Sequence, residues 1–327
     1  ALYGINAAGG AIIITTKSGS GKGNKRLKVE LSSQFSIDKV NKLPEIQKKY
    51  TLGENGSIAD FAWNGSNGVS YGALIDTCRY DGESDIYDQN GNIVGMSSAP
   101  ANAKFVKPYH NMDKFFQPAY NFNNHLSISG AFNKGNYYFS TGLMNQTGII
   151  PKTNFKRTTI QLSGDYKLTK NIKVSGSVSY SNSGGVRAQR GSNASGVIFG
   201  LLRANEMFDY SNGVADPVND KRAYMLDDTL QRTFYYDIEN PYWSINKNQV
   251  RDKVNRNISY AKVDYTLIPD LNVSYRAGLD IYKETVKSYM SNYSKDPEIT
   301  NVGWLSLDTT NFMSFNSDLI ISFDKNI

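Results

Sequence analysis

The sequence predicts an all-β protein built on one antiparallel sheet of about eight strands, typical of the wall of a transmembrane β-barrel. Three observations support this prediction. Long segments alternate apolar and polar side chains, the connections between them sort by length, and no run of residues is apolar enough for a membrane helix. Mean hydropathy is −0.47, which a barrel tolerates because only every second strand residue faces lipid.

The clearest alternation lies in residues 159–168. Ile160 and Leu162 fall on one face of this segment, and Gln161 and Ser163 fall on the other. A period of two over this length indicates a sheet with one apolar and one polar face. The same pattern predicts further strands at residues 27–37, 126–132, 137–143, 172–180, 261–267, 271–281 and 313–323.

The connections between these strands are sorted by length. Short turns are expected at residues 133–136, 169–171 and 269–270. The other connections are expected at about 39–124, 149–154, 183–254 and 288–311. Because strands alternate in direction, the short turns all fall at one rim and the mostly long excursions at the other, the arrangement of outer-membrane barrels.

Composition narrows the function classes. The chain has 327 residues, enough for one large or two modest domains, and 36 Lys and Arg against 30 Asp and Glu give a net charge of +6. The basic residues are scattered, which argues against a nucleic-acid partner. A single cysteine, Cys78, excludes an intrachain disulfide framework and a cysteine-based zinc site. The 22 Tyr, 15 Phe and 3 Trp fit aromatic girdles, a soluble β-sandwich or a glycan-binding surface.

The first nineteen residues, ALYGINAAGGAIIITTKSG, place a glycine turn before a strand that is apolar or β-branched on both faces. This stretch resembles the plug–barrel junction of TonB-dependent outer-membrane transporters. Residues 124–183 and 239–282 resemble the SusC/RagA group of that family in the order and spacing of their strands. The chain departs from the family at Ile5, Asn6 and Gly9, which affects local plug contacts only.

The resemblance implies a barrel of about 22 strands that is closed by an N-terminal plug, in the outer membrane of a Gram-negative, Bacteroidota-like cell. Residues 1–19 would end the plug, residues 20–25 would be a linker, and residues 26–327 would form the first part of the barrel. The implied function is TonB-dependent active import of oligomeric nutrients, glycans or peptides. The implied partners are TonB, outer-membrane lipid and a SusD-like lipoprotein lid.

Three sets of residues are candidates for function. The plug junction would use Leu2, Tyr3, Gly4, Gly9 and Gly10. Six charged residues are expected to face the barrel lumen, because a charge that faced lipid near the midplane would cost about 2–4 kcal/mol. They are Asp165, Lys167, Lys262, Asp264, Arg276 and Asp280. Loop aromatics that could stack on sugar rings are Trp63, Tyr71, Tyr80, Trp243 and Trp304. The alternatives are that the charged residues pair with one another and that the aromatics pack their own loops.

Catalysis, cofactors and metals have little support. His110 and His125 are the only histidines, and neither Ser/His/Asp order nor paired carboxylates stand out. Residues 85–95 resemble a calcium loop, but Ile86 stands where the first carboxylate ligand is needed. We therefore expect a protein that is not an enzyme. A passive small barrel or adhesin, and a secreted β-rich carbohydrate-active enzyme, are the alternatives.

Overall fold

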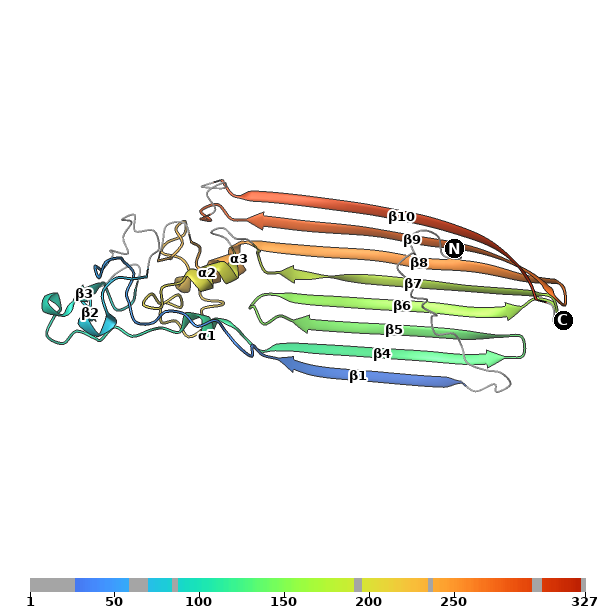
Figure 1. Cartoon of the computed structure of the whole chain (residues 1–327), viewed down its shortest axis with the longest axis horizontal. Coiled ribbons are helices and arrows are strands. Elements are labelled where there is room, and N and C mark those ends of the chain that lie inside the picture. Colours follow the sequence, from blue (N-terminus) through green and yellow to red (C-terminus); the bar gives the residue numbers. More distant parts are fainter. Residues whose placement is uncertain are drawn as a thin grey trace.

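The computed structural model describes residues 27–58, 70–83, 88–190, 196–234, 238–295 and 302–324. They contain an eight-stranded antiparallel sheet in which the strands follow one another in chain order (Figure 1). The strands are β1 (Lys28–Asp38), β4 (Ala119–Phe132), β5 (Gly135–Thr147), β6 (Asn154–Lys167), β7 (Ile172–Arg187), β8 (Gln249–Ile268), β9 (Leu271–Met290) and β10 (Trp304–Phe323). The predicted all-β class is confirmed. The sheet is open, with β1 and β10 at its edges, so a closed barrel stays a prediction.

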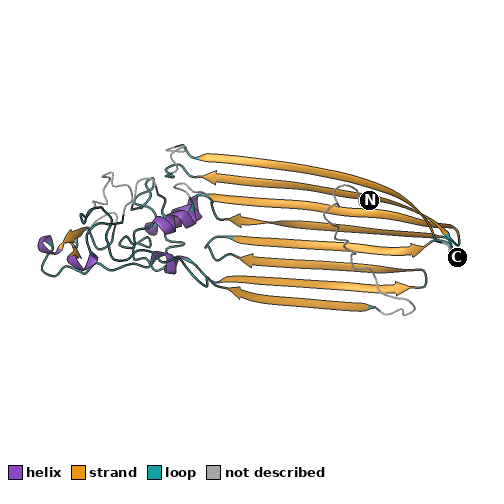
Figure 2. Ribbon diagram, viewed as in Figure 1, coloured by secondary structure: helices purple, strands orange, loops and turns teal. Residues whose placement is uncertain are grey.

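The remaining elements lie beyond one end of the sheet. They comprise the short hairpin β2 (Cys78–Tyr80) and β3 (Ile93–Gly95) and the helices α1 (Asn111–Phe115), α2 (Val197–Arg203) and α3 (Pro241–Lys247). Three 3₁₀ turns lie at Ile75–Thr77, Met96–Ser98 and Lys221–Ala223. Figure 2 shows that these helices gather with their loops at one end, while the strands fill the rest of the molecule.

Cross-strand register keeps the two faces of the sheet distinct. One row runs across all eight strands through directly paired residues: Val29, Ile128, Phe139, Leu162, Val178, Ser259, Leu279 and Phe315. A shift of one residue at any pairing would turn a whole strand over and mix the faces. A register irregularity lies between Thr266 and Ile268, beside the β8–β9 turn. The alternation read from the sequence is therefore preserved across the whole width of the sheet.

The predicted sorting of connections is confirmed in the structure. Short turns join β4 to β5, β6 to β7 and β8 to β9 at one end, and the long excursions leave from the other (Figure 1). Several strands extend further into the long connections than predicted. β4 begins at Ala119, β7 ends at Arg187 and β8 begins at Gln249. β9 ends at Met290, and β10 begins at Trp304. In the extension of β7, polar side chains such as Ser181, Asn182 and Ser183 occupy both faces, so backbone pairing continues there without an alternation signal.

The predicted plug segment (1–19) and linker (20–25) lie outside the described residues. So do Leu2, Tyr3, Gly4, Gly9 and Gly10, which were predicted to form the plug junction.

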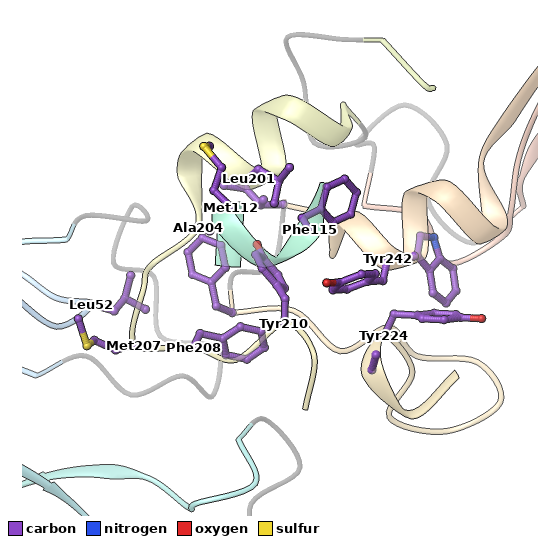
Figure 3. Packing of buried hydrophobic residues seen from close by; sticks show 14 of the residues in the cluster. Leu52, Met112, Phe115, Leu201, Ala204, Met207, Phe208, Tyr210, Tyr224 and Tyr242 are labelled. Atoms are coloured by element: carbon purple, nitrogen blue, oxygen red, sulfur yellow. The ribbon is translucent and has the colours of Figure 1, made fainter. Parts of the chain in front are cut away.

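The hydrophobic core lies in the excursions and not in the sheet. We use the term loop module for the described parts of residues 40–118, 196–248 and 291–295. Twenty buried apolar residues from this region form one cluster, which includes Phe115 from α1, Leu201 from α2 and Trp243 from α3. Figure 3 shows Leu201, Met112 and Phe115 meeting, with Phe208 and Tyr210 close by. The three long connections thus fold together as one packed body.

Glycines allow close contact at the β4–β5 hairpin. Gly130 lies directly opposite Tyr137, and the Tyr137 ring covers the space where a Gly130 side chain would be. Gly135 follows the turn, and a Cβ atom there would lie 2.0 Å from the backbone oxygen of Asp165 on β6. A side chain at Gly135 would therefore push β5 and β6 apart.

We predict that Gly135→Ala lowers the stability of the sheet by about 1–3 kcal/mol, because the added methyl group meets backbone that cannot rotate away. Gly95→Ala is the matched control, since a Cβ atom at Gly95 finds its nearest neighbour at 4.0 Å. Thermal unfolding of the full-length protein in detergent measures both. Equal melting temperatures for the two variants would show that the β5–β6 contact is looser than described.

Candidate functional site

The polar face of the sheet carries several ion pairs. Some join neighbouring strands, and others join residues of the same strand. Arg256 on β8 contacts Asp280 on β9 through two nitrogens, Nε to Oδ1 at 2.9 Å and Nη2 to Oδ2 at 2.6 Å. Near the loop module, Arg187 Nε lies 2.8 Å from Oδ1 of Asp252, whose side chain is almost fully buried. Two-point contacts between arginine and carboxylate fix geometry as well as charge. These pairs hold β7, β8 and β9 in register on the face opposite the apolar one.

A second group of charges lies nearer the short turns. Lys173 Nζ contacts Asp165 Oδ2 at 3.3 Å across the β6–β7 pairing. Lys262 Nζ contacts Asp264 Oδ1 at 2.7 Å, and Ser274 Oγ donates to the same carboxylate oxygen at 2.5 Å. Two of the lysines on this part of the polar face thus pair with aspartates within the sheet.

All six residues predicted to face a lumen lie on this polar face. Register places Asp165, Lys262 and Arg276 in one row, with Ser175 between the first two. Asp165, Lys262, Asp264 and Asp280 take part in ion pairs, and the Arg276 guanidinium lies 4.6 Å from the centre of the Tyr260 ring. Lys167 is exposed at the end of β6. The arrangement favours mutual pairing for most of them, the alternative that the sequence left open.

The loop aromatics divide into two pairs. Tyr80 and Trp243 are buried in the core of the loop module, and the Trp243 indole Nε1 donates to Ser294 Oγ at 3.2 Å. Tyr71 and Trp304 are exposed, with Tyr71 6.1 Å from the Tyr50 ring. Trp63 lies outside the described residues. Of the proposed sugar-stacking residues, only Tyr71 and Trp304 therefore present an accessible ring among those described, and Tyr80 and Trp243 act as packing residues.

Residues 195–210 have helix-like spacing of apolar residues at Ile198, Leu201, Leu202 and Met207. The structure has α2 there, with Val197 and Leu201 buried and Ile198 and Leu202 exposed. Met207 is fully buried beyond the helix end. One side of the segment therefore packs within the loop module, and the other faces outward.

A buried polar network joins two excursions inside the loop module. Arg232 is fully buried, with its guanidinium 4.3 Å from the centre of the Phe208 ring, and burial lowers its pKa to about 10 while Asp88 and Asp209 oppose that shift. The Asp88 carboxylate accepts from Asn90 N at 2.8 Å and from Tyr109 Oη at 3.1 Å, and burial raises its pKa. A buried cation near two carboxylates ties residues 88–109 to residues 209–232.

Glu239 makes a second buried polar link. Its carboxylate accepts from Ser244 Oγ at 2.7 Å, from Asn248 Nδ2 at 2.8 Å and from Lys295 N at 3.0 Å. Burial raises the pKa of Glu239 to about 7, although these hydrogen bonds oppose the shift. The carboxylate therefore connects α3 to the segment after β9 and titrates near neutral pH.

Sequence reasoning missed these buried charges. Arg232 and Glu239 lie in excursions without periodicity, where a charged residue is usually a solvated one. Asp88 was noticed only as part of a failed calcium loop, and no group of three metal-binding side chains occurs among the residues that the structure describes. A weak signal was present: aromatic residues surround Arg232 and Glu239 in the sequence QRTFYYDIENPYW.

Comparison with known proteins gives a consistent result. No family model matches the chain. TonB-dependent receptor P26 of Formosa agariphila is 26% identical over 181 residues, which cover 55% of this chain and 15% of the receptor. TonB-dependent receptor SusC of Bacteroides thetaiotaomicron is 23% identical over 306 residues, or 90% of this chain and 26% of SusC. This chain is similar to TonB-dependent receptors of the SusC group. The resemblance read from the sequence is thereby confirmed.

Solved structures agree on the fold. The RagAB peptide importer in its closed-closed state matches with a TM-score of 0.66 at 18% identity, covering 100% of this chain and 35% of that chain. Its open-open state matches with a TM-score of 0.65. The chain thus spans about a third of the solved chains and about a quarter or less of the curated receptors. These matches are described as receptors and importers, which agrees with the expectation that the chain is not an enzyme.

Among the described residues, the helices are all too short or too polar to cross a bilayer.

We predict that the loop module loses stability as pH rises from about 4.5 to about 7. The raised pKa of Glu239 means that the folded chain holds a proton which the unfolded chain has released in that window. Amide hydrogen exchange in α3 and residues 291–295, corrected for intrinsic exchange rates, measures local opening. We expect the opening constant to increase with pH over this window, by roughly a hundred-fold.

Glu239→Gln is the control, because it cannot release this proton and should flatten the pH dependence. An equally steep dependence in Glu239→Gln would mean that another group causes it.

Proposed function

We propose that this chain forms part of the barrel wall and the outer loops of a TonB-dependent outer-membrane importer. One observation carries the proposal: a wide sheet keeps an apolar and a polar face in register across eight strands, with its packed core outside the sheet. In a soluble protein such an apolar face would need a covering layer. Large side chains such as Leu162 and Leu319 are instead exposed among the described residues, as expected for contact with lipid.

The open edges fit a wall that continues. Among the described residues, β1 pairs only with β4 and β10 only with β9. A free edge of twenty residues, as in β10, is a strong template for pairing with another strand. We propose that further strands close the barrel, that residues 1–19 end a plug within it, and that residues 20–25 link the two. Residues 26–327 would then supply the first part of the wall.

The polar face would line the interior. Its paired charges, including Arg256 with Asp280 and Lys262 with Asp264, would give a hydrophilic surface against which a plug can pack and move. The loop module would lie on the outer side, where a SusD-like lipoprotein could cap the opening. The transported class would be an oligomeric nutrient, glycan or peptide, since SusC and the RagAB peptide importer are both similar to this chain.

The central experiment measures uptake in cells that lack the gene, after complementation with the full-length protein. Labelled neutral oligosaccharides and oligopeptides are supplied with and without functional TonB. Uptake that needs both the gene and TonB supports active import. Uptake that persists without TonB would favour a passive barrel, and recovery of the full-length protein in the soluble fraction would exclude both.

We predict that Leu162→Asp impairs assembly into the outer membrane and that Gln161→Asp does not. The two positions are adjacent on β6 but point to opposite faces, and a charge near the middle of the lipid face is destabilising, by about 2–4 kcal/mol for Arg or Lys and by less for Asp. The amount of folded, heat-modifiable protein in outer-membrane fractions measures the effect. Equal loss in both variants would contradict the assignment of faces.

A further inference from the structure

The apolar face of the sheet carries charge in one place only. Among the described strand residues that share this face, five are charged, and all of them lie toward the long-connection ends of β6, β8 and β9. We call this group the basic patch; its members are Lys156, Arg251, Lys253, Lys283 and Lys287. All five residues are exposed, and no Asp or Glu of the described strands shares their face.

Register brings the charges of the basic patch close together. Arg251 on β8 lies directly opposite Lys287 on β9, an arrangement of like charges that is destabilising by itself. Lys253 lies opposite Thr285, so Lys283 and Lys287 are its diagonal neighbours at about 7–8 Å. The sheet therefore holds cations side by side at a cost that an anion between them would offset.

The basic patch is not neutralised by the protein. None of its five residues forms an ion pair within the part of the chain that the structure describes. Arg251 donates from Nε and Nη2 to Gln249 Oε1, at 3.2 and 2.9 Å, which orients its guanidinium and leaves further N–H donors. Lys156 and Lys253 lie in one row with only Gly184, which has no side chain, between them. The five charges thus form one surface with free donors.

The opposite face shows what the same strand segments do with charge elsewhere. At this level the polar face carries acidic as well as basic side chains: Asp252 pairs with Arg187, and Glu284 lies on β9 between Lys283 and Thr285. Acidic residues are therefore available in these segments but occupy only the inward face. The separation of sign between the two faces indicates an anionic partner on the outward one.

The basic patch begins where the apolar rows end. On β9 the apolar residues of this face run from Leu271 to Ile281, close to the 9–11 residues with which a tilted strand crosses the hydrocarbon core. Two residues of a strand tilted by about 40° rise by about 5 Å, so Lys283 lies about 5 Å beyond the last apolar row. Arg251 and Lys287 lie about 15 Å beyond it, and long basic side chains can reach back toward the boundary. This is the level of lipid headgroups.

A groove of about 390 Å³ marks the boundary itself. Ile281 and Met313 line it on the apolar side, and Lys283 lines it on the side of the basic patch. Asn255, also in the lining, accepts hydrogen bonds at its Oδ1 from Tyr180 Oη at 3.0 Å and from Asn182 Nδ2 at 2.7 Å. The surface therefore changes within one groove from apolar to polar to cationic, the order of groups in an anionic lipid.

We propose that the basic patch binds the phosphate groups of anionic lipid in the outer leaflet, while the acyl chains lie on the apolar rows below. Phosphate is the group that carries negative charge in bilayer lipids, and it matches both the fork of an arginine and the point charge of a lysine. The inference rests on the proposed membrane wall, which places the long connections outside the cell, and it names the lipid chemistry that this part of the wall selects.

The test measures lipid binding by native mass spectrometry of the full-length protein, delipidated in a nonionic detergent at low salt. The probes are phosphorylated lipid A, the same lipid A after removal of its phosphate, and inorganic phosphate. The patch variant combines Arg251→Gln, Lys253→Gln and Lys287→Gln. We expect it to bind phosphorylated lipid A at least about ten-fold more weakly than wild type, because each basic residue beside an anionic lipid surface contributes about five-fold.

The matched control removes the same number of charges elsewhere. It combines Lys42→Gln, Lys107→Gln and Lys114→Gln, three exposed lysines of the loop module. This control should bind phosphorylated lipid A as wild type does, and dephosphorylated lipid A should bind equally weakly to all three proteins. If the patch variant does not fold, the single variants Lys253→Gln and Lys287→Gln decide, with an expected loss of about five-fold each.

Four results would overturn the proposal. These are equal affinity of wild type for the two forms of lipid A, unchanged binding in the patch variant, an equal loss in the loop-module control, and displacement of the lipid by an equal concentration of inorganic phosphate, which would assign the patch to free phosphate. Because this binding needs neither TonB nor a nutrient, its failure beside intact TonB-dependent uptake would contradict the lipid site and leave the import proposal standing.

Discussion

The structure depends on cross-strand register. Eight strands can separate an apolar from a polar face only if each pairing aligns the alternation of one strand with that of the next, and a single slip would reverse a face. Rows of paired residues, such as the one from Val29 to Phe315, show this alignment across the sheet. Ion pairs such as Arg256 with Asp280 strengthen it on one side. A wall between lipid and a hydrophilic interior requires this separation of faces.

The loop module solves a different physical problem. Long connections at a rim cannot use the sheet for burial, since one face is apolar and exposed and the other is polar. They instead bury their own apolar residues around Trp243 and Phe208, and they cross-link through buried charges at Arg232 and Glu239. The loop module is joined to the sheet by the ends of β1, β4, β7 and β8.

Much of the sheet could be predicted from sequence, because a period of two is a local signal that residues such as Ile160 to Leu168 carry on their own. The extension of β7 to Arg187 could not, because polar residues such as Ser181, Asn182 and Ser183 occupy both of its faces. The burial of Tyr80 and Trp243 and the roles of Arg232 and Glu239 depend on contacts between excursions far apart in sequence. Periodicity contains no information about such contacts.

The most direct test of the membrane-wall assignment is the environment of consecutive residues on β6 in native outer membranes. After replacement of the buried Cys78 by alanine, single spin labels at positions 158 to 165 report accessibility to oxygen and to a water-soluble nickel complex. We expect a period of two, with even positions such as 160 and 162 oxygen-accessible in lipid and odd positions such as 161 and 163 shielded from lipid. Uniform accessibility to the nickel complex along the strand would contradict the assignment.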